Sequence, residues 1–227
     1  MRDDELSGLL SRLFQAHPWH GVPAHEGDAD LLTAFIEIVP TDTVKYELHK
    51  PSGHLHVDRP QRFSSICPTL YGFIPQTYCA EQIGARCAER VGGGPYYGDG
   101  DPLDICVLTE KAIAHGNLFV RVRPIGGLRM IDGNQADDKI VAVLHDDIAW
   151  GSLREIADVP AGIVDRLRHY FLSYKRRPDE KDEGRVRIGE VYDRAEAREV
   201  VTRSMVDYRA HFGLPEERLA QLRRLLG

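Results

Sequence analysis

The residues with the clearest capacity for chemistry are three carboxylates within six positions, Asp99, Asp101 and Asp104. Like charges this close repel one another, and such a cluster is favoured where a cation compensates it. Hard divalent cations such as Mg²⁺ and Ca²⁺ select oxygen ligands. Gly100 allows a tight turn and Pro102 stiffens the chain, so the three carboxylates can converge on one point. The segment therefore indicates a divalent-cation site, although a solvated acidic turn before a strand accounts for the same residues.

Two other templates for this segment do not fit. A calcium-binding loop of the form D-x-[DN]-x-[DN]-G matches Asp99 and Asp101, but Leu103 takes the place of the third ligand and Asp104 that of the required glycine. A phosphate-binding P-loop fails as well, because Asp-Gly follows the glycines where Lys and then Ser or Thr are required.

A second acidic group, Asp132, Asp137 and Asp138 with Lys139, lies between two strand-like segments. Taken alone, it is explained as a hairpin connection with exposed charges. If its flanking strands pair with the strand that begins at Asp104, however, the two acidic loops share one end of a sheet.

Candidate anion-binding side chains occur elsewhere in the chain. Lys45 and Glu47 are two positions apart on a predicted strand, so they face the same side. Arg59 ends the next predicted strand, and Tyr174 and Lys175 end a predicted helix. Each of these residues is also explained singly as a surface charge or, for Tyr174, as a core aromatic.

The elements that must position these side chains are short strands followed by helices. Strand patterns occupy 31–39, 44–49, 53–59, 104–109, 118–130 and 139–145, with a turn over 50–53. Helical periodicity occupies 5–16, 160–174, 194–211 and 215–226. The helices do not alternate with the strands, which disfavours a doubly wound sheet. The pattern predicts an α+β fold, mainly β, built on a small barrel or curled antiparallel sheet with helices packed outside.

Composition narrows the class of protein. The chain has 227 residues with 29 lysines and arginines against 35 aspartates and glutamates, a net charge of -6 that disfavours nucleic acid as a partner. It contains no apolar run of the roughly 20 residues that a membrane span needs, and its acidic start does not match a secretory signal. The cysteines lack C-x-x-C spacing and are expected to be reduced thiols: Cys67, Cys79, Cys87 and Cys106. A cytoplasmic globular protein is expected.

The hexapeptide DGDPLD at 99–104, followed by apolar residues, resembles the signature of the soluble family I inorganic pyrophosphatases. Further matches follow in consistent order, at 35–40, 44–47, 55–59, 68–75, 121–126, 130–132, 137–139 and 174–175. The resemblance covers about 31–211 and is specific, because chance does not place so many matches in register.

The resemblance implies an OB-like five-stranded barrel with flanking helices. It implies one catalytic domain over 1–227, with a core of about 31–211, helical extensions at both ends and an insertion near 79–97. The implied reaction is Mg²⁺-dependent hydrolysis of pyrophosphate to two phosphates by direct attack of a metal-activated water. Several Mg²⁺ ions per site are implied, with Mn²⁺ or Zn²⁺ as substitutes. The substrate is pyrophosphate as its magnesium complex, and a homo-oligomer without nucleic-acid or membrane partners is expected.

The resemblance also implies a role for each matching residue. The implied metal ligands are Asp99, Asp104, Asp132, Asp137, Glu37 and Glu47, the two glutamates directly or through water. Asp101 is the implied base beside the nucleophilic water. The implied phosphate-binding residues are Lys45, Arg59, Tyr71, Lys139, Tyr174 and Lys175.

The chain departs from the family pattern in three places. Cys67 stands where bacterial members commonly have a tyrosine, which removes one hydroxyl from the expected site. The insertion at 79–97 lies near the expected mouth of the site, where a solvated loop is the favoured interpretation and a lid the alternative. The terminal helices at 5–16 and 215–226 and Ser173, in place of an interface histidine, keep the bacterial hexamer from being carried over.

Two other functions fit the sequence less well than the enzyme. A non-enzymatic barrel that binds nucleic acid needs aromatic and basic residues interleaved on its strands, whereas this chain offers carboxylates on its loops. A catalytically inactive relative is disfavoured because Lys45, Arg59 and Asp101 are intact.

Overall fold

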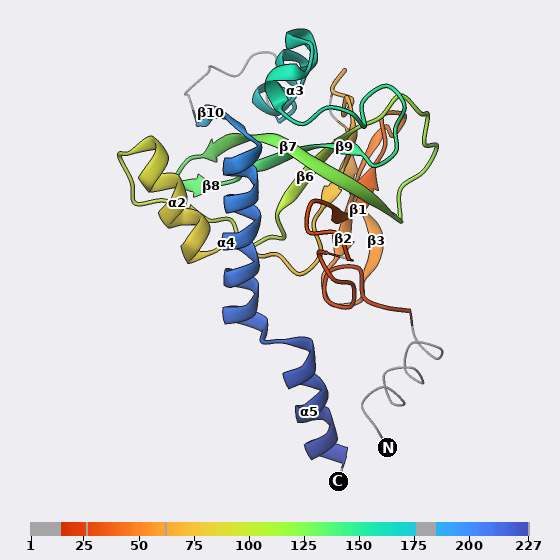
Figure 1. Cartoon of the computed structure of the whole chain (residues 1–227), viewed down its shortest axis with the longest axis vertical. Helices are drawn as coiled ribbons and strands as arrows, with labels where there is room; N and C mark the ends of the chain where they lie inside the picture. Colours follow the sequence, from red (N-terminus) through yellow and green to blue (C-terminus); the bar gives the residue numbers. More distant parts are fainter. Residues whose placement is uncertain (1–14, 26, 62, 176–184, 227) are drawn as a thin grey trace.

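The computed structural model describes residues 15–25, 27–61, 63–175 and 185–226 (Figure 1). The helix expected at 5–16 lies outside these residues except for its last two positions, which are not helical. Within the described residues every helix is too short or too polar to be a transmembrane span.

Five strands form a closed ring, which confirms the predicted OB-like five-stranded architecture. Each strand pairs with the next, and the last pairs with the first, in the order β1 (Leu32–Ile38), β4 (Leu70–Phe73), β6 (Asp104–Leu108), β9 (Lys139–Leu144) and β7 (Leu118–Asp132). Only β6 and β9 run parallel within the ring. Closure leaves no free edge in the ring, and its apolar side chains form the core.

The long strand β7 joins the ring to a further strand. Its first half pairs with β1, and its second half, from Gly126 to Asp132, pairs with β10 (Val186–Asp193). Glycine is required where the two meet, because a Cβ on Gly127 would lie 2.4 Å from the ring of Tyr192. Two-residue strands β5 (Tyr97–Gly98) and β8 (Gln135–Ala136) extend this sheet. β4, β5, β8 and β10 were not predicted as strands.

A separate hairpin lies beside the ring, as predicted. β2 (Val44–His49) pairs with β3 (His54–Pro60) in antiparallel register. The turn between them ends at Gly53, whose φ of 72° lies in the left-handed region that glycine adopts without strain.

The three predicted C-terminal helices are confirmed, and one short 3₁₀ helix precedes them at Ile156–Asp158. They are α3 (Ala161–Ser173), α4 (Arg194–Phe212) and α5 (Pro215–Leu226). Figure 1 shows α4 running along one side of the ring and α5 continuing away from it.

Residues 79–97, which the family resemblance marks as an insertion, contain a helix, so the interpretation of this segment as a solvated loop was wrong. α2 (Glu81–Val91) packs against α4 and buries Ile83, Gly84 and Cys87. The spacing of Ile83 and Cys87, one helical turn apart, places both on the core side. Close packing also requires Gly84, where a Cβ would lie 2.4 Å from the carbonyl oxygen of Tyr96. All four cysteines are buried and free, as expected.

An aromatic cluster fastens the N-terminal segment to the far end of α4. Trp19 and His20 stack on each other and pack against Tyr208 and Phe212. His20 Nδ1 lies 2.8 Å from the hydroxyl of Tyr208. Burial, with the positive charges of His17 and Arg218 adding to it, lowers the pKa of His20 to about 4.

Acidification should weaken this cluster. The unfolded chain binds a proton at His20 near pH 6.5 and the folded chain only near pH 4, so the stability contributed by neutral His20 is complete above pH 6.5 and declines as the pH falls toward 4. His20→Asn removes this titration. The ratio between the unfolding equilibrium constants of His20→Asn and of the unaltered protein should therefore become roughly tenfold smaller between pH 7 and pH 4, after allowing for the partial exposure of His20. Urea unfolding at pH 7, 5.5 and 4 measures this, and a pH-independent difference would contradict it.

Candidate active site

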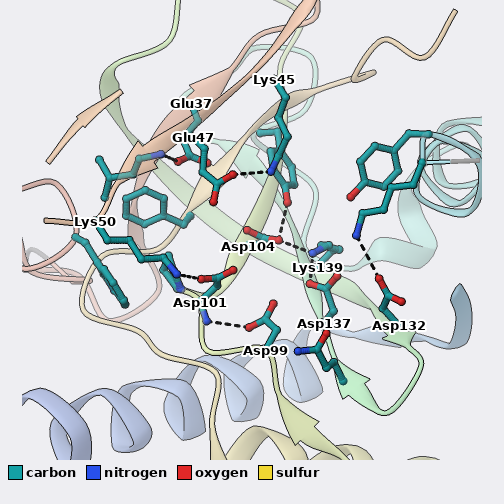
Figure 2. A pocket seen from close by; sticks show the side chains of 18 residues that line it. Glu37, Lys45, Glu47, Lys50, Asp99, Asp101, Asp104, Asp132, Asp137 and Lys139 are labelled. Atoms are coloured by element: carbon teal, nitrogen blue, oxygen red, sulfur yellow. Dashed lines mark hydrogen bonds and ion pairs between the residues drawn. The ribbon is translucent and has the colours of Figure 1, made fainter. Parts of the chain in front are cut away.

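A cavity of about 340 Å³ opens where the ends of the ring strands meet the β2–β3 hairpin (Figure 2). Seven carboxylates line it: Glu37, Glu47, Asp99, Asp101, Asp104, Asp132 and Asp137. Four lysines line it with them: Lys45, Lys50, Lys139 and Lys175. Tyr71 and Tyr174 add hydroxyl groups. The cavity therefore contains every residue implied by the family resemblance except Arg59.

The parallel pair of strands brings the two acidic loops together. β6 and β9 lie side by side with Asp104 opposite Lys139. The loop at 99–103 leads into β6, and residues 133–138 lead into β9, so both segments meet at the same end of this parallel pair of strands. This is the shared end of the sheet that the sequence predicted. The same geometry corrects the interpretation of the second group as exposed charges, because Asp138 and Lys139 are buried.

Lys139 lies at the centre of the carboxylates. Its ammonium group contacts the carboxylates of both Asp104 and Asp137, and the hydroxyl of Tyr71 donates a hydrogen bond of 2.5 Å to Asp104. Burial opposes the charge on Lys139, but the two aspartates outweigh it and raise its pKa above the usual value. Lys139 is thus a charged side chain held in a fixed place.

The remaining negative charge is poorly compensated. Burial first, and then the charge of Asp104, raise the pKa of Glu37 to about 8, even though its carboxylate accepts a hydrogen bond of 2.7 Å from the backbone of Leu48. Burial and the neighbouring Asp137 likewise raise the pKa of Asp99. Seven carboxylates against four lysines leave an excess of three negative charges when all are ionised. Such a site favours additional cations.

Lys45 and Glu47 face the same side of β2, as expected, and their side chains lie 2.8 Å apart. Lys45 also contacts Asp58 at 3.2 Å. Arg59 donates to the same carboxylate of Asp58 at 2.5 Å, so its guanidinium lies next to the cavity without lining it.

The loop that carries Asp101 is fixed by its own hydrogen bonds. The backbone N–H of Asp101 donates to Asp99 at 3.0 Å, across Gly100, whose φ is 78°. The backbone N–H of Leu103 donates at 2.9 Å to the hydroxyl of Thr77, which is fully buried. The Asp101 side chain remains accessible, with 43% of its surface exposed.

Six cavity residues were not among the predicted site residues: the apolar Leu48, Phe73 and Pro102, and Trp19, Lys50 and Gln135, whose side chains carry polar atoms. Lys50 belongs to a segment interpreted only as a turn, yet its ammonium group contacts Asp101 and lies 5.9 Å from the centre of the Trp19 ring. No spacing in the sequence links Lys50 to Asp101, because the contact depends on how the hairpin lies over the ring.

Cys67 does not line the cavity. It is 1% exposed and packs in the core with Cys106 and Tyr170. Its thiol therefore supplies no polar group to the cavity in place of the expected hydroxyl.

The opposite wall of the cavity carries Asp132 and Lys175. Asp132 pairs with Lys175 at 3.2 Å and with Arg185 at 2.9 Å. Burial opposes ionisation of Asp132, but these two cations prevail and lower its pKa.

The donor set fits a hard divalent cation. It consists of carboxylate oxygens, it carries excess negative charge, and several of its pKa values are raised in the way that an added cation would reverse. Among the described residues, no three carboxylate, imidazole or thiol groups are already arranged around one point as metal ligands. The ammonium group of Lys139 lies between the carboxylates of Asp104 and Asp137, which would hold the ion.

Comparison with known proteins agrees with this geometry. The family model for inorganic pyrophosphatase matches residues 34–209. A curated relative from Chlamydia muridarum, named inorganic pyrophosphatase, is 46% identical over 195 residues, which is 85% of this chain and 93% of the relative. A soluble inorganic pyrophosphatase of Oryza sativa subsp. indica is 35% identical over 75% of this chain and 71% of its own.

Solved structures give the same result. The crystal structure of the inorganic pyrophosphatase from Thermus thermophilus superimposes with a TM-score of 0.69 at 29% identity, over 86% of this chain and 99% of that one. The type I enzyme from Toxoplasma gondii has a TM-score of 0.75 at 26% identity, over 87% and 89%. With the matched family model, the closed ring and the acidic cavity in agreement, the chain belongs to the inorganic pyrophosphatase family.

Proposed function

We propose that this chain hydrolyses inorganic pyrophosphate to two phosphates with bound divalent cations, Mg²⁺ in the first place. One observation carries the proposal: a single cavity combines an excess of carboxylates with lysine and tyrosine side chains. Carboxylates bind hard cations, and lysines bind phosphate oxygens. Membership of the family supports the same reaction, since relatives from Chlamydia muridarum and rice carry its name.

The place of each carboxylate in the cavity determines which cation it would hold. Asp99, Asp104 and Asp137, which lie around Lys139, would hold cations directly, and Asp132, Glu37 and Glu47 would hold further ions from the cavity walls. A bound divalent cation offsets the charge of the phosphate oxygens and lowers the pKa of a coordinated water. An acidic cavity repels free pyrophosphate, so the substrate enters as its magnesium complex.

The cationic and hydroxyl side chains bind the phosphates. Lys45, Lys139 and Lys175 come from three separate elements, so they surround the cavity, and Tyr71 and Tyr174 add hydroxyl donors. Arg59 joins them from beside the cavity, where it shares Asp58 with Lys45. These groups neutralise the charge that develops on the leaving phosphate when the bridging P–O bond breaks.

Asp101 is the proposed base. It is accessible in the cavity and its loop is fixed, so it can orient the attacking water and accept its proton. Direct attack by water needs no covalent intermediate, and the described cavity residues include no serine, cysteine or histidine to form one.

Replacing the base should abolish most activity without loss of fold. Asp101→Asn keeps the size and hydrogen bonds of the side chain but cannot accept the proton, so phosphate release from pyrophosphate at millimolar Mg²⁺ should fall by about 10²–10⁴-fold. A phosphate-release assay with an EDTA control measures this, and circular dichroism checks the fold. Undiminished release by Asp101→Asn would exclude Asp101 as the base, and no EDTA-sensitive release from the unaltered protein would exclude the proposed function.

Divalent cations should stabilise the fold through the same carboxylates. Mg²⁺ at about 100 times its Kd stabilises by about 2.7 kcal/mol for a single bound ion, which raises the Tm of a chain of this size by roughly 5–10 °C. Asp99→Asn removes a half-buried, repelled charge, so it should not lower the Tm without metal but should reduce the rise caused by Mg²⁺. The matched control is Asp146→Asn, since Asp146 lies outside the cavity and its side chain is 87% exposed. Calorimetric melting measures all three proteins, and an equal rise in each would contradict a role for Asp99 in cation binding.

A further inference from the structure

Arg129 is a fully buried cation near the end of β7, with none of its surface exposed. The residues opposite it on both sides are acids. Glu190 on β10 is its direct partner in register, and the register that places Leu128 opposite Lys139 places Asp138 opposite Arg129. A buried charge in mid-sheet is costly unless it is paired, so this arrangement of charges requires an explanation.

Three carboxylates and an aromatic ring surround the guanidinium. Its Nε lies 3.4 Å from Glu190, its Nη2 contacts Glu196, and its Nη1 lies 3.7 Å from Asp138. The ring of Tyr192 lies 5.0 Å from its central carbon. Glu190 and Glu196 each have a second arginine partner, Arg90 and Arg86 respectively, whereas Asp138 does not among the described residues.

Asp138 depends on Arg129. Its side chain is 1% exposed, and within the part of the chain that the structure describes neither of its carboxylate oxygens has a hydrogen-bond partner. The charge of Arg129 is therefore its main compensation. Removing Arg129 would leave an uncompensated buried carboxylate.

The position of Asp138 connects this pair to the cavity. Asp138 lies between Asp137 and Lys139, both of which line the cavity, while its own side chain does not. Because side chains alternate along an extended chain, an Asp138 held in the core directs its two neighbours to the cavity side. The backbone N–H of Asp137 donates at 2.9 Å to the carbonyl of Met130, which fastens the same turn to β7.

The charges continue from Arg129 to the insertion helix. Glu196, in the first turn of α4, contacts Arg129 on one side and Arg86 of α2 on the other, where Arg86 Nε lies 3.0 Å from Glu196 Oε1. Arg86 also contacts Glu89 at 2.8 Å within α2. An alternating series of charges thus runs from α2 through α4 to the edge of the cavity.

We propose that Arg129 and Asp138 are positioning residues that hold Asp137 and Lys139 in place for cation and phosphate binding, and that Glu196 of α4 and Arg86 of α2 brace Arg129. The inference rests on the proposed function of the cavity. It gives the insertion a supporting role from behind the site, in place of the lid considered from the sequence.

The test separates positioning from simple stability. Asp138→Asn removes the carboxylate that faces Nη1 of Arg129, while Glu190 and Glu196 still pair with the rest of the guanidinium. It should therefore lower the Tm and raise the Kd for Mn²⁺, used as the probe in isothermal titration calorimetry, by about fivefold or more. The double variant Arg129→Met with Asp138→Asn removes both charges, and Glu190 and Glu196 keep Arg90 and Arg86. Its Tm should return toward that of the unaltered protein, while its Kd for Mn²⁺ stays raised and its kcat stays low.

Two results would overturn the inference. If the double variant recovers both its Tm and its Mn²⁺ affinity, the pair serves stability alone. If Asp138→Asn folds and binds Mn²⁺ normally, Asp138 positions nothing. Arg86→Met tests the link to α2 and should raise the Kd in the same direction by about twofold, whereas the control Arg198→Met, an exposed arginine of α4 that pairs with Asp30, should not. An unchanged Kd in Arg86→Met would remove α2 from the proposal.

The proposed function can fail independently. If the unaltered protein binds Mn²⁺ but releases no phosphate from pyrophosphate with Mg²⁺, the enzymatic proposal fails, while the comparison of Kd values still decides whether Arg129 and Asp138 position the site.

Discussion

Mutual repulsion among carboxylates confined to one cavity is the constraint on which the rest of this structure depends. Seven acids can be held together only if cations lie among them and if the backbone prevents the side chains from moving apart. Lys139 meets the first requirement at the centre of the cavity. The closed ring meets the second, because the acids come from strand ends and short loops whose strands are paired on both sides. The fold and the charge pattern are therefore parts of one arrangement.

The local chemistry of the site was predictable from sequence, whereas much of its support was not. Asp99, Asp101 and Asp104 stand close together in the chain, and Lys45 and Glu47 follow the period of a strand, so their proximity follows from spacing alone. Lys50 was not predicted as a site residue because its contact with Asp101 spans 51 positions and depends on the placement of a hairpin. Short-range spacing predicts which side chains share a face, but it does not predict which separate elements meet.

Two of the elements that were missed, α2 and β10, bury little apolar surface of their own. α2 contributes few buried side chains, and its amphipathic pattern lies within a segment rich in charge and glycine, so the sequence favoured a loop. β10 alternates half-buried and exposed residues, buries only Tyr192 and is defined by its pairing with β7. Arg129 is the clearest case, because an arginine in a strand is usually a surface residue and becomes interpretable only when acids are found on both neighbouring strands.

The aromatic cluster has a consequence for the order in which the molecule is assembled during synthesis. Trp19 lines the cavity, and its neighbour His20 is joined to Tyr208, 188 positions later. The ring strands can pair once β9 has left the ribosome, and Trp19 can already contact Thr77 and Tyr78, but its contacts with Tyr208 and Phe212 must wait until the end of α4 has been made. Contacts of such long separation form late. A nascent chain would therefore close its ring before the wall of the cavity that contains Trp19 is fully packed.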